Sequence, residues 1–162
     1  MTISVGDKLP EATFVEIGAE GPAPVSVADL TGGKKVALFA VPGAYTPTCH
    51  MKHVPSFIEN ADALRAKGVD QIVCISVNDP FVMKAWGEST GATAAGIRMM
   101  SDAQSAFTKE IGLDFTAPPV GLIDRSQRYS MLIEDGVVKT LNVEATPGDA
   151  DKSTGDAMLE QV

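Results

Sequence analysis

Two short, mostly apolar runs with a helical pattern between them place the strongest constraint on the fold. The runs are Val36–Val41 and Gln71–Val77, and runs of this length suit strands that are buried on both faces. Between them, apolar residues recur at helical spacing from position 48 to position 67, and Gly68 provides a helix stop. A strand, a helix and a second strand in this order predict parallel pairing and therefore an α/β fold whose central sheet is flanked by helices.

The chain also carries signals for a helix kink and for two further helices. Pro55 lies inside the first expected helix, where it removes an amide donor and predicts a kink. The turn Asn78-Asp79-Pro80 predicts a helix start that leads into residues 81–87. Ser101-Asp102 predicts the start of another helix, which ends near Ile111.

The last third of the chain predicts a β-hairpin. Asp135-Gly136 is a favoured two-residue turn, and it separates the apolar runs 129–134 and 137–143. An antiparallel hairpin beside parallel strands predicts a mixed sheet. Residues 117–121 are expected to form a long loop. Because neither a repeat nor a linker divides the chain, residues 1–162 are predicted to form a single domain.

Composition excludes several classes of function. A net charge of -8 and an isoelectric point near 4.6 disfavour binding to nucleic acid, which needs clustered basic residues. No apolar run approaches the roughly 20 residues that span a bilayer, and the N-terminal residues do not resemble a leader. Two cysteines in such a chain favour a reducing compartment, so we expect a cytoplasmic protein with free thiols.

One of the two cysteines follows a helix-start signal. In Thr46-Pro47-Thr48-Cys49, threonine suits the cap and proline suits the first helical position, so Cys49 takes the third. Free amides and the helix dipole stabilise negative charge there, which favours a reactive thiolate. The alternative is a buried cysteine that acts as a small apolar residue. The Thr46 hydroxyl is expected near the sulfur, where it could bond the thiolate or a substrate hydroxyl.

The remaining candidate residues favour structural roles. His50 and His53 could supply the base of a Cys/His hydrolase, but residues one and four positions after Cys49 need not face its sulfur, and we interpret both as surface or core histidines. Cys74 lies in the middle of a predicted strand and is expected to be buried and inert. Because the cysteines are 25 positions apart, no Cys-x-x-Cys occurs and the chain has only two histidines, no metal site and no cofactor are predicted.

Two arginines precede the predicted hairpin. Arg125 and Arg128 lie in Asp-Arg-Ser-Gln-Arg-Tyr-Ser, where arginines are usually solvated loop charges. A guanidinium that the fold brought beside Cys49 would stabilise its thiolate.

A resemblance to a known family adds to this interpretation. Pro42-x-x-x-Thr46-x-x-Cys49 resembles the active-site pattern of the peroxiredoxins, and its surroundings from Val41 to Pro55 are similar to the peroxiredoxin 5, or type II, branch. The segments 74–82 and 128–144 resemble the same branch in order and spacing, so the resemblance covers nearly the whole chain.

The resemblance implies a thioredoxin-like fold and a thiol peroxidase. In this family the peroxidatic cysteine, here Cys49, attacks the O–O bond of hydrogen peroxide or an alkyl hydroperoxide and becomes a sulfenic acid. Thr46 would hydrogen-bond the peroxide and the thiolate, Arg128 would stabilise the developing charge, and Pro42 would shield the pocket. The family also implies a homodimer packed through the active-site face.

The cysteine count predicts how the sulfenic acid is reduced. Some relatives resolve it with a cysteine near the C-terminus, but residues 150–155 here are Ala-Asp-Lys-Ser-Thr-Gly and no cysteine follows Cys74. We expect a one-cysteine cycle with glutaredoxin and glutathione, or thioredoxin, as the reductant. A cysteine-based redox sensor or relay, and a Cys/His hydrolase, remain as alternatives.

Overall fold

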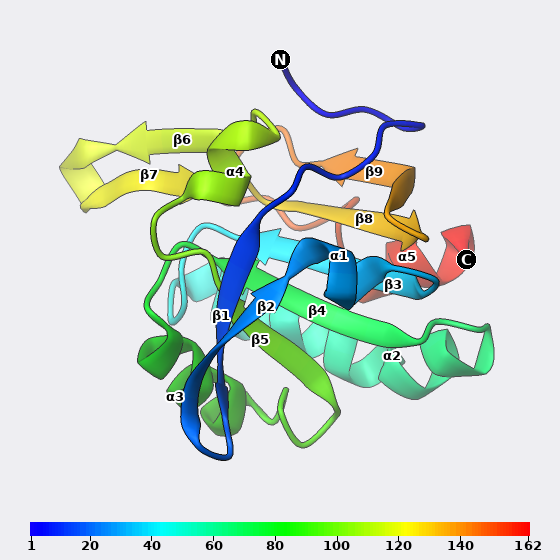
Figure 1. Ribbon diagram of the computed structural model, residues 1–162. Helices are drawn as coiled ribbons and strands as arrows, with labels where there is room; N and C mark the ends of the chain where they lie inside the picture. The colour runs from blue at the N-terminus through cyan, green and yellow to red at the C-terminus, as the bar shows by residue number, and fades with distance from the viewer.

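The computed structural model describes residues 1–162 and contains a central sheet with helices on both faces (Figure 1). In chain order, its elements are β1 (Thr13–Gly18), β2 (Gly21–Ser26), α1 (Val27–Thr31), β3 (Lys35–Val41), η1 (Cys49–His53), α2 (Val54–Ala66), β4 (Gln71–Ser76), α3 (Pro80–Thr90), β5 (Ile97–Ser101), α4 (Ala106–Glu110), β6 (Asp114–Ala117), η2 (Pro118–Val120), β7 (Leu122–Ser126), β8 (Tyr129–Glu134), β9 (Val137–Val143) and α5 (Gly155–Gln161). The seven-stranded sheet has the order β2-β1-β5-β4-β3-β8-β9, and β6 and β7 form a separate pair.

The sheet is mixed, as predicted. Strands β3, β4 and β5 are parallel neighbours, whereas β8 pairs antiparallel with β3 and β1 pairs antiparallel with β5. The two apolar runs that suggested buried strands form β3 and β4, and the hairpin around Asp135-Gly136 forms β8 and β9. The expected α/β class, with a central mixed sheet flanked by helices, is therefore confirmed.

Alternating side chains of the central strands enter two cores on opposite faces of the sheet. Phe39 and Cys74 pack with residues of α2, α3 and α5. Leu38 and Val73 pack on the other face with residues of α1 and α4. Burial on both faces explains why β3 and β4 are continuously apolar instead of alternating.

The predicted helix after Asn78-Asp79-Pro80 is present as α3. The Asp79 carboxylate accepts a hydrogen bond from the amide of Val82 at 2.9 Å and caps the helix. None of the helices combines the length and the apolar character needed to span a bilayer.

The helix predicted to start at Ser101 begins later. Ser101 is the last residue of β5 because it pairs with Ser76 of β4, and the helix is the short α4, from Ala106. Asp102 still serves the helix start, since its carboxylate accepts hydrogen bonds from the amides of Phe107 and Thr108. The predicted start is therefore wrong by several residues, because strand pairing continues through Ser101 and the residue before the helix is Ser105.

The long loop expected at residues 117–121 is also wrong in part. Its prolines form the 3-10 turn η2, which joins β6 and β7 into a hairpin. The N-terminal hairpin of β1 and β2 was not predicted, because Pro22 and Pro24 weaken the strand signal. Since β2 lies at the edge of the sheet, prolines are tolerated there.

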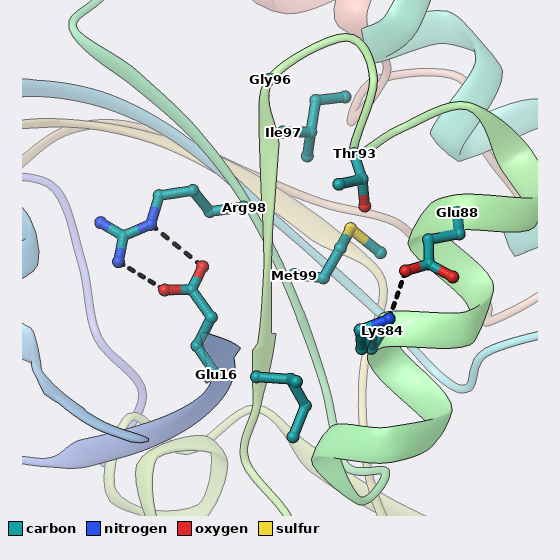
Figure 2. Close-up of a pocket in the computed structure, with 9 residues that line it drawn as sticks. Glu16, Lys84, Glu88, Thr93, Gly96, Ile97, Arg98 and Met99 are labelled. Carbon is teal, nitrogen blue, oxygen red and sulfur yellow. Dashed lines mark hydrogen bonds and ion pairs between the residues drawn. The ribbon is translucent and has the colours of Figure 1, made fainter. Parts of the chain in front are cut away.

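Strand β1 is held against β5 partly by side chains. Backbone pairing between these strands involves only Val15 and Ser101. Figure 2 shows the Arg98 guanidinium of β5 bonded to both carboxylate oxygens of Glu16 in β1, at 3.1 and 2.7 Å. The pair lines a surface hollow of about 250 Å³ whose other ion pair joins Lys84 and Glu88 of α3.

The C-terminal helix α5 packs directly on α2. The amide of Gly155 donates to the Ser56 hydroxyl at 2.9 Å. A Cβ atom added at Gly155 would overlap the Ser56 carbonyl and lie 3.0 Å from the Cα of Phe57. Glycine at this position therefore permits the close approach of the two helices.

We expect Gly155→Ala to lower the free energy of unfolding by about 1–3 kcal/mol, because the backbones of α2 and α5 must separate. Urea unfolding measures the change. Gly148→Ala is the matched control, since an added Cβ there meets no atom within 4 Å, and its stability should stay within about 0.5 kcal/mol of the parent. Equal stability of the two variants would contradict the close packing.

Candidate active site

Cys49 lies near the start of a continuous helical segment. Residues from Pro47 onward are helical, which confirms the predicted helix start and places Cys49 at its third position. Cys49 begins the π-helical turn η1, in which the amide of Val54 donates to the Cys49 carbonyl, and regular α-helix follows. A wider turn of this kind is frequent at functional sites. Pro55, from which a kink is predicted, follows this turn as the second residue of α2. The side chain of Cys49 has no exposed surface.

A buried arginine contacts the cysteine sulfur. Arg128 directly precedes β8 and is 2% exposed. One terminal nitrogen, Nη2, donates to Cys49 Sγ at 3.0 Å, and the other, Nη1, lies 2.9 Å from Nδ1 of His53. Nε and Nη2 also donate to the carbonyl of Pro147, at 3.1 and 3.0 Å. The fold thus brings Arg128 and Cys49 together, although 79 positions separate them in the sequence.

His53 is a buried, neutral partner of this arginine. Its Nε2 lies 2.8 Å from the Ser153 carbonyl, which can only accept, so Nε2 carries the proton and Nδ1 accepts from Arg128. Burial and the charge of Arg128 lower the pKa of His53 to about 3, while the hydrogen bond to Ser153 opposes them. The interpretation as a core histidine is confirmed, but its contact with Arg128 was missed. Its position four residues after Cys49, on the same helix face, was the available signal.

Thr46 adopts a different hydrogen bond from the one predicted. Its hydroxyl donates to the Gly43 carbonyl at 2.7 Å, so the prediction that its side chain caps the helix amides is wrong. The backbone carbonyl of Thr46 accepts from the amide of His50 and starts the helical ladder. Because the hydroxyl proton is used by Gly43, the oxygen lone pairs are left to accept a hydrogen bond.

Pro42 is buried at the end of β3, where the chain leaves the sheet. Its carbonyl accepts a hydrogen bond from Nη1 of Arg125 at 3.1 Å. The absence of a side chain at Gly43 permits this approach, since a Cβ there would lie 2.6 Å from the same nitrogen. Arg125 of β7, interpreted as a possible loop charge, therefore anchors the segment 42–46. The amide of Ala44 donates to the Asn78 side chain and supplies a second anchor.

The other histidine is engaged away from the sulfur. His50 Nδ1 accepts a hydrogen bond from the Trp86 indole at 3.0 Å, and its ring stacks on Tyr45. Neither imidazole is hydrogen-bonded to Cys49. The geometry therefore lacks the thiol–imidazole pair that a Cys/His hydrolase needs.

Cys74 is fully buried in β4, as predicted. Burial raises the pKa of its thiol, the nearby Cys49 raises it further, and Arg128 opposes both effects. Both cysteines are free. No three side chains of His, Cys, Asp or Glu are grouped in a way that could hold a metal ion.

The comparisons with known proteins agree with this geometry. The family model described as Redoxin matches residues 4–159. The chain is 51% identical to peroxiredoxin-2E-2, chloroplastic, from Oryza sativa subsp. japonica, covering 98% of this chain and 72% of that protein. It is 48% identical to peroxiredoxin-2E, chloroplastic, from Arabidopsis thaliana, covering 97% and 68%.

Solved structures show the same fold. Reduced Prx3 in complex with hydrogen peroxide from Vibrio vulnificus has a TM-score of 0.93 at 48% identity, with 99% of both chains covered. Peroxiredoxin 5 from Alvinella pompejana has a TM-score of 0.84 at 34% identity, with 98% of this chain and 96% of that chain covered.

The predicted cytoplasmic location is contradicted by these comparisons and is wrong. Both plant relatives are chloroplastic proteins. The prediction used free cysteines as its signal, and free cysteines report a reducing environment, which does not by itself identify the compartment.

The motif around Cys49, the fold and the relatives converge on one family. The chain has a thioredoxin-like fold and is a thiol peroxidase. It belongs to the Redoxin family, as a peroxiredoxin of the type II, peroxiredoxin 5-like branch.

Proposed function

We propose that Cys49 is the peroxidatic residue and that it reduces hydrogen peroxide and alkyl hydroperoxides. The observation that carries the proposal is the 3.0 Å contact between the Arg128 guanidinium and Cys49 Sγ in a site with no exposed sulfur surface. A permanent positive charge beside a buried sulfur favours the thiolate over the thiol. The thiolate is the form that attacks peroxide.

The proposed step conserves atoms and electrons. The sulfur lone pair forms an S–O bond to the terminal peroxide oxygen, and the O–O bond breaks. Sulfur is oxidised to the sulfenic acid, and the peroxide is reduced to alkoxide or hydroxide, which takes a proton and leaves as alcohol or water. Arg128, whose guanidinium lies at the sulfur, stabilises the negative charge as it moves toward the leaving oxygen.

Thr46 and Pro42 are proposed to shape the peroxide site. The Thr46 hydroxyl donates to Gly43, so its lone pairs can accept a hydrogen bond from the O–H of a hydroperoxide and orient the O–O bond. Pro42 is buried and offers no N–H donor, which suits a role in shielding the thiolate from water.

We propose a one-cysteine cycle completed by an external thiol. A thiol condenses with the sulfenic acid to give a mixed disulfide and water, and a second thiol releases Cys49 by exchange. Glutaredoxin with glutathione, or thioredoxin, would supply these thiols. The burial of Cys74 in the middle of β4 supports this cycle, because its thiol is held within the strand and is disfavoured from ionising.

We also propose that residues 1–162 form a single domain and that two copies of the chain pack through their active-site faces as a homodimer. Tyr45 of the active-site loop, Phe81 at the start of α3 and Val120 in η2 are each more than half exposed. Exposed apolar side chains that gather near a site favour an interface. In Figure 1, α3 lies at the lower left and the β6–β7 hairpin at the upper left.

Intact-mass analysis after one equivalent of hydrogen peroxide, without reductant, tests the proposal. The wild type and Cys74→Ser should each gain one oxygen atom on Cys49, and glutathione should then give a mixed disulfide at Cys49. Cys49→Ser should gain no oxygen and have no peroxidase activity. Loss of two hydrogens, with Cys49 joined to Cys74, would instead indicate an intramolecular two-cysteine cycle. Sulfenic acid formation without catalytic turnover of peroxide and thiol would indicate a sensor.

Thr46→Val should lower the second-order rate constant for hydrogen peroxide by about 100-fold, because the acceptor for the peroxide hydroxyl is lost. Stopped-flow single-turnover kinetics measures it. Thr46→Ser keeps the hydroxyl and is the matched control, with a rate near that of the wild type. If the rate constants of Thr46→Val and Thr46→Ser were equal, the hydroxyl would not be needed for the reaction and Thr46 would have only a structural role.

The buried neutral state of His53 predicts acid sensitivity. The pKa of His53 is about 3 in the fold and about 6.5 when unfolded, so its contribution to stability is present above pH 6.5 and is lost as pH falls toward 3. The loss is about 1.4 kcal/mol per pH unit. Between pH 7 and pH 5, urea unfolding should show the wild type losing about 2 kcal/mol more than His53→Gln. Parallel pH profiles would contradict the buried neutral imidazole.

A further inference from the structure

The carboxylate of Glu144, the residue that follows β9, accepts four hydrogen bonds on one oxygen. Glu144 is 6% exposed, and its Oε2 accepts from the amides of Asp151, Lys152 and Ser153 at 2.9, 2.9 and 2.8 Å. The Ser153 hydroxyl donates to the same oxygen at 2.6 Å. Burial alone would raise the pKa of Glu144, but the hydroxyl and these amides lower it below its usual value. Three of the four donors are backbone amides, and neither a lysine nor an arginine pairs with the carboxylate. Glu144 therefore stabilises the conformation of the backbone at residues 151–153.

The amides that Glu144 holds, those of residues 151–153, form the C-terminal part of the segment 147–153, which we name the carbonyl loop. Two carbonyls of this loop serve the active site. The Pro147 carbonyl accepts from Nε and Nη2 of Arg128, and the Ser153 carbonyl accepts from Nε2 of His53. The loop therefore supplies acceptors both to the arginine and to its histidine partner.

These contacts set the direction in which Arg128 points. Its Nη2 is shared between the Pro147 carbonyl and Cys49 Sγ, so a shift of that carbonyl moves the donor that faces the sulfur. Rotation of His53 would likewise move the acceptor of Nη1. The amide of Glu144 donates to the Arg128 carbonyl at 3.0 Å, so the two residues lie side by side just beyond the last pair of β8 and β9, Tyr129 and Val143.

We propose that Glu144 is a positioning residue for the peroxidase reaction, acting through the carbonyl loop to hold the Arg128 guanidinium on Cys49. This inference rests on the proposed role of Arg128. Glu144 touches neither the sulfur nor the peroxide site, so its effect is indirect. The Ala150–Gly155 stretch, where some relatives carry a resolving cysteine, here serves as part of this support.

Variants in a Cys74→Ser background, where Cys49 is the one remaining thiol, test the proposal. Two quantities are measured: the pH dependence of Cys49 alkylation by iodoacetamide, and the second-order rate constant with hydrogen peroxide, corrected for the folded fraction. Glu144→Ala should lower the rate constant by about 10-fold to 100-fold and shift the alkylation profile to higher pH. Glu144→Gln should recover part of both, because its amide oxygen still accepts hydrogen bonds.

Glu134→Ala and Glu134→Gln are the matched controls. Glu134 lies at the opposite end of the same β8–β9 hairpin, where its half-exposed carboxylate reaches only Lys35, at 3.9 Å. Both variants should match the parent in rate and in alkylation profile. A merely structural carboxylate at position 144 would change the unfolding temperature and leave the two corrected quantities unchanged.

An Arg128→Gln variant distinguishes a failure of the positioning role of Glu144 from a failure of the proposed role of Arg128. If it loses rate and shifts the profile while folded Glu144→Ala keeps the parent values, the positioning role is wrong and the role of Arg128 stands. If Arg128→Gln itself keeps the parent values, the proposed role of Arg128 is wrong. The positioning role of Glu144, which depends on Arg128, is then wrong as well. Should Glu144→Ala fail to fold, Glu144→Gln decides: a loss relative to Glu134→Gln supports the proposal, and parent values overturn it.

Discussion

The active site depends on one buried cation. Arg128 is 2% exposed, and a charge removed from water is costly unless its N–H groups are paired. The pairing groups are the Pro147 carbonyl, the neutral imidazole of His53 and the Cys49 sulfur. The first two carry no net charge, so the guanidinium remains uncompensated while the thiol is protonated. Of these three partners only the Cys49 sulfur can take a negative charge, which links the buried guanidinium to the proposed chemistry of the sulfur.

Strand register brings this cation to the cysteine. Tyr129 of β8 pairs with Ala40 of β3, so the residue before β8 lies beside the point where β3 ends. The chain leaves β3 at that edge, passes through the anchored segment 42–46 and enters the helix that carries Cys49. The antiparallel contact between two central strands thus joins parts of the site that are far apart in sequence. Because both strands are buried in the sheet, the contact is rigid, which suits a site that depends on 3 Å distances.

Regular elements with strong local signals were predictable from the sequence. The central strands, the hairpin at Asp135-Gly136, the helix capped by Asp79 and the helix start before Cys49 all depend on patterns within a few residues. Elements with weak local signals were missed or misplaced. The β1–β2 hairpin contains two prolines, and β5 extends through Ser101 because its neighbours pair with it. In both cases strand pairing overrides local preference.

The features of the candidate site likewise fall into those that local sequence patterns predict and those that depend on tertiary contacts. The sequence by itself determined a thiol at the third position of a helix and, through its motif, the family. It did not determine that the Thr46 hydroxyl bonds Gly43 instead of the helix amides, nor that His53 faces Arg128. Nor did it indicate that Glu144 organises a loop whose carbonyls reach the active site. The Thr46–Gly43 bond spans only three residues, but it forms in a segment that Arg125 and Asn78 anchor from elsewhere in the fold. The other contacts join residues 7 to 100 positions apart. Only the tertiary structure decides them, because a hydrogen bond requires two groups to meet in space and local spacing says nothing about the partner.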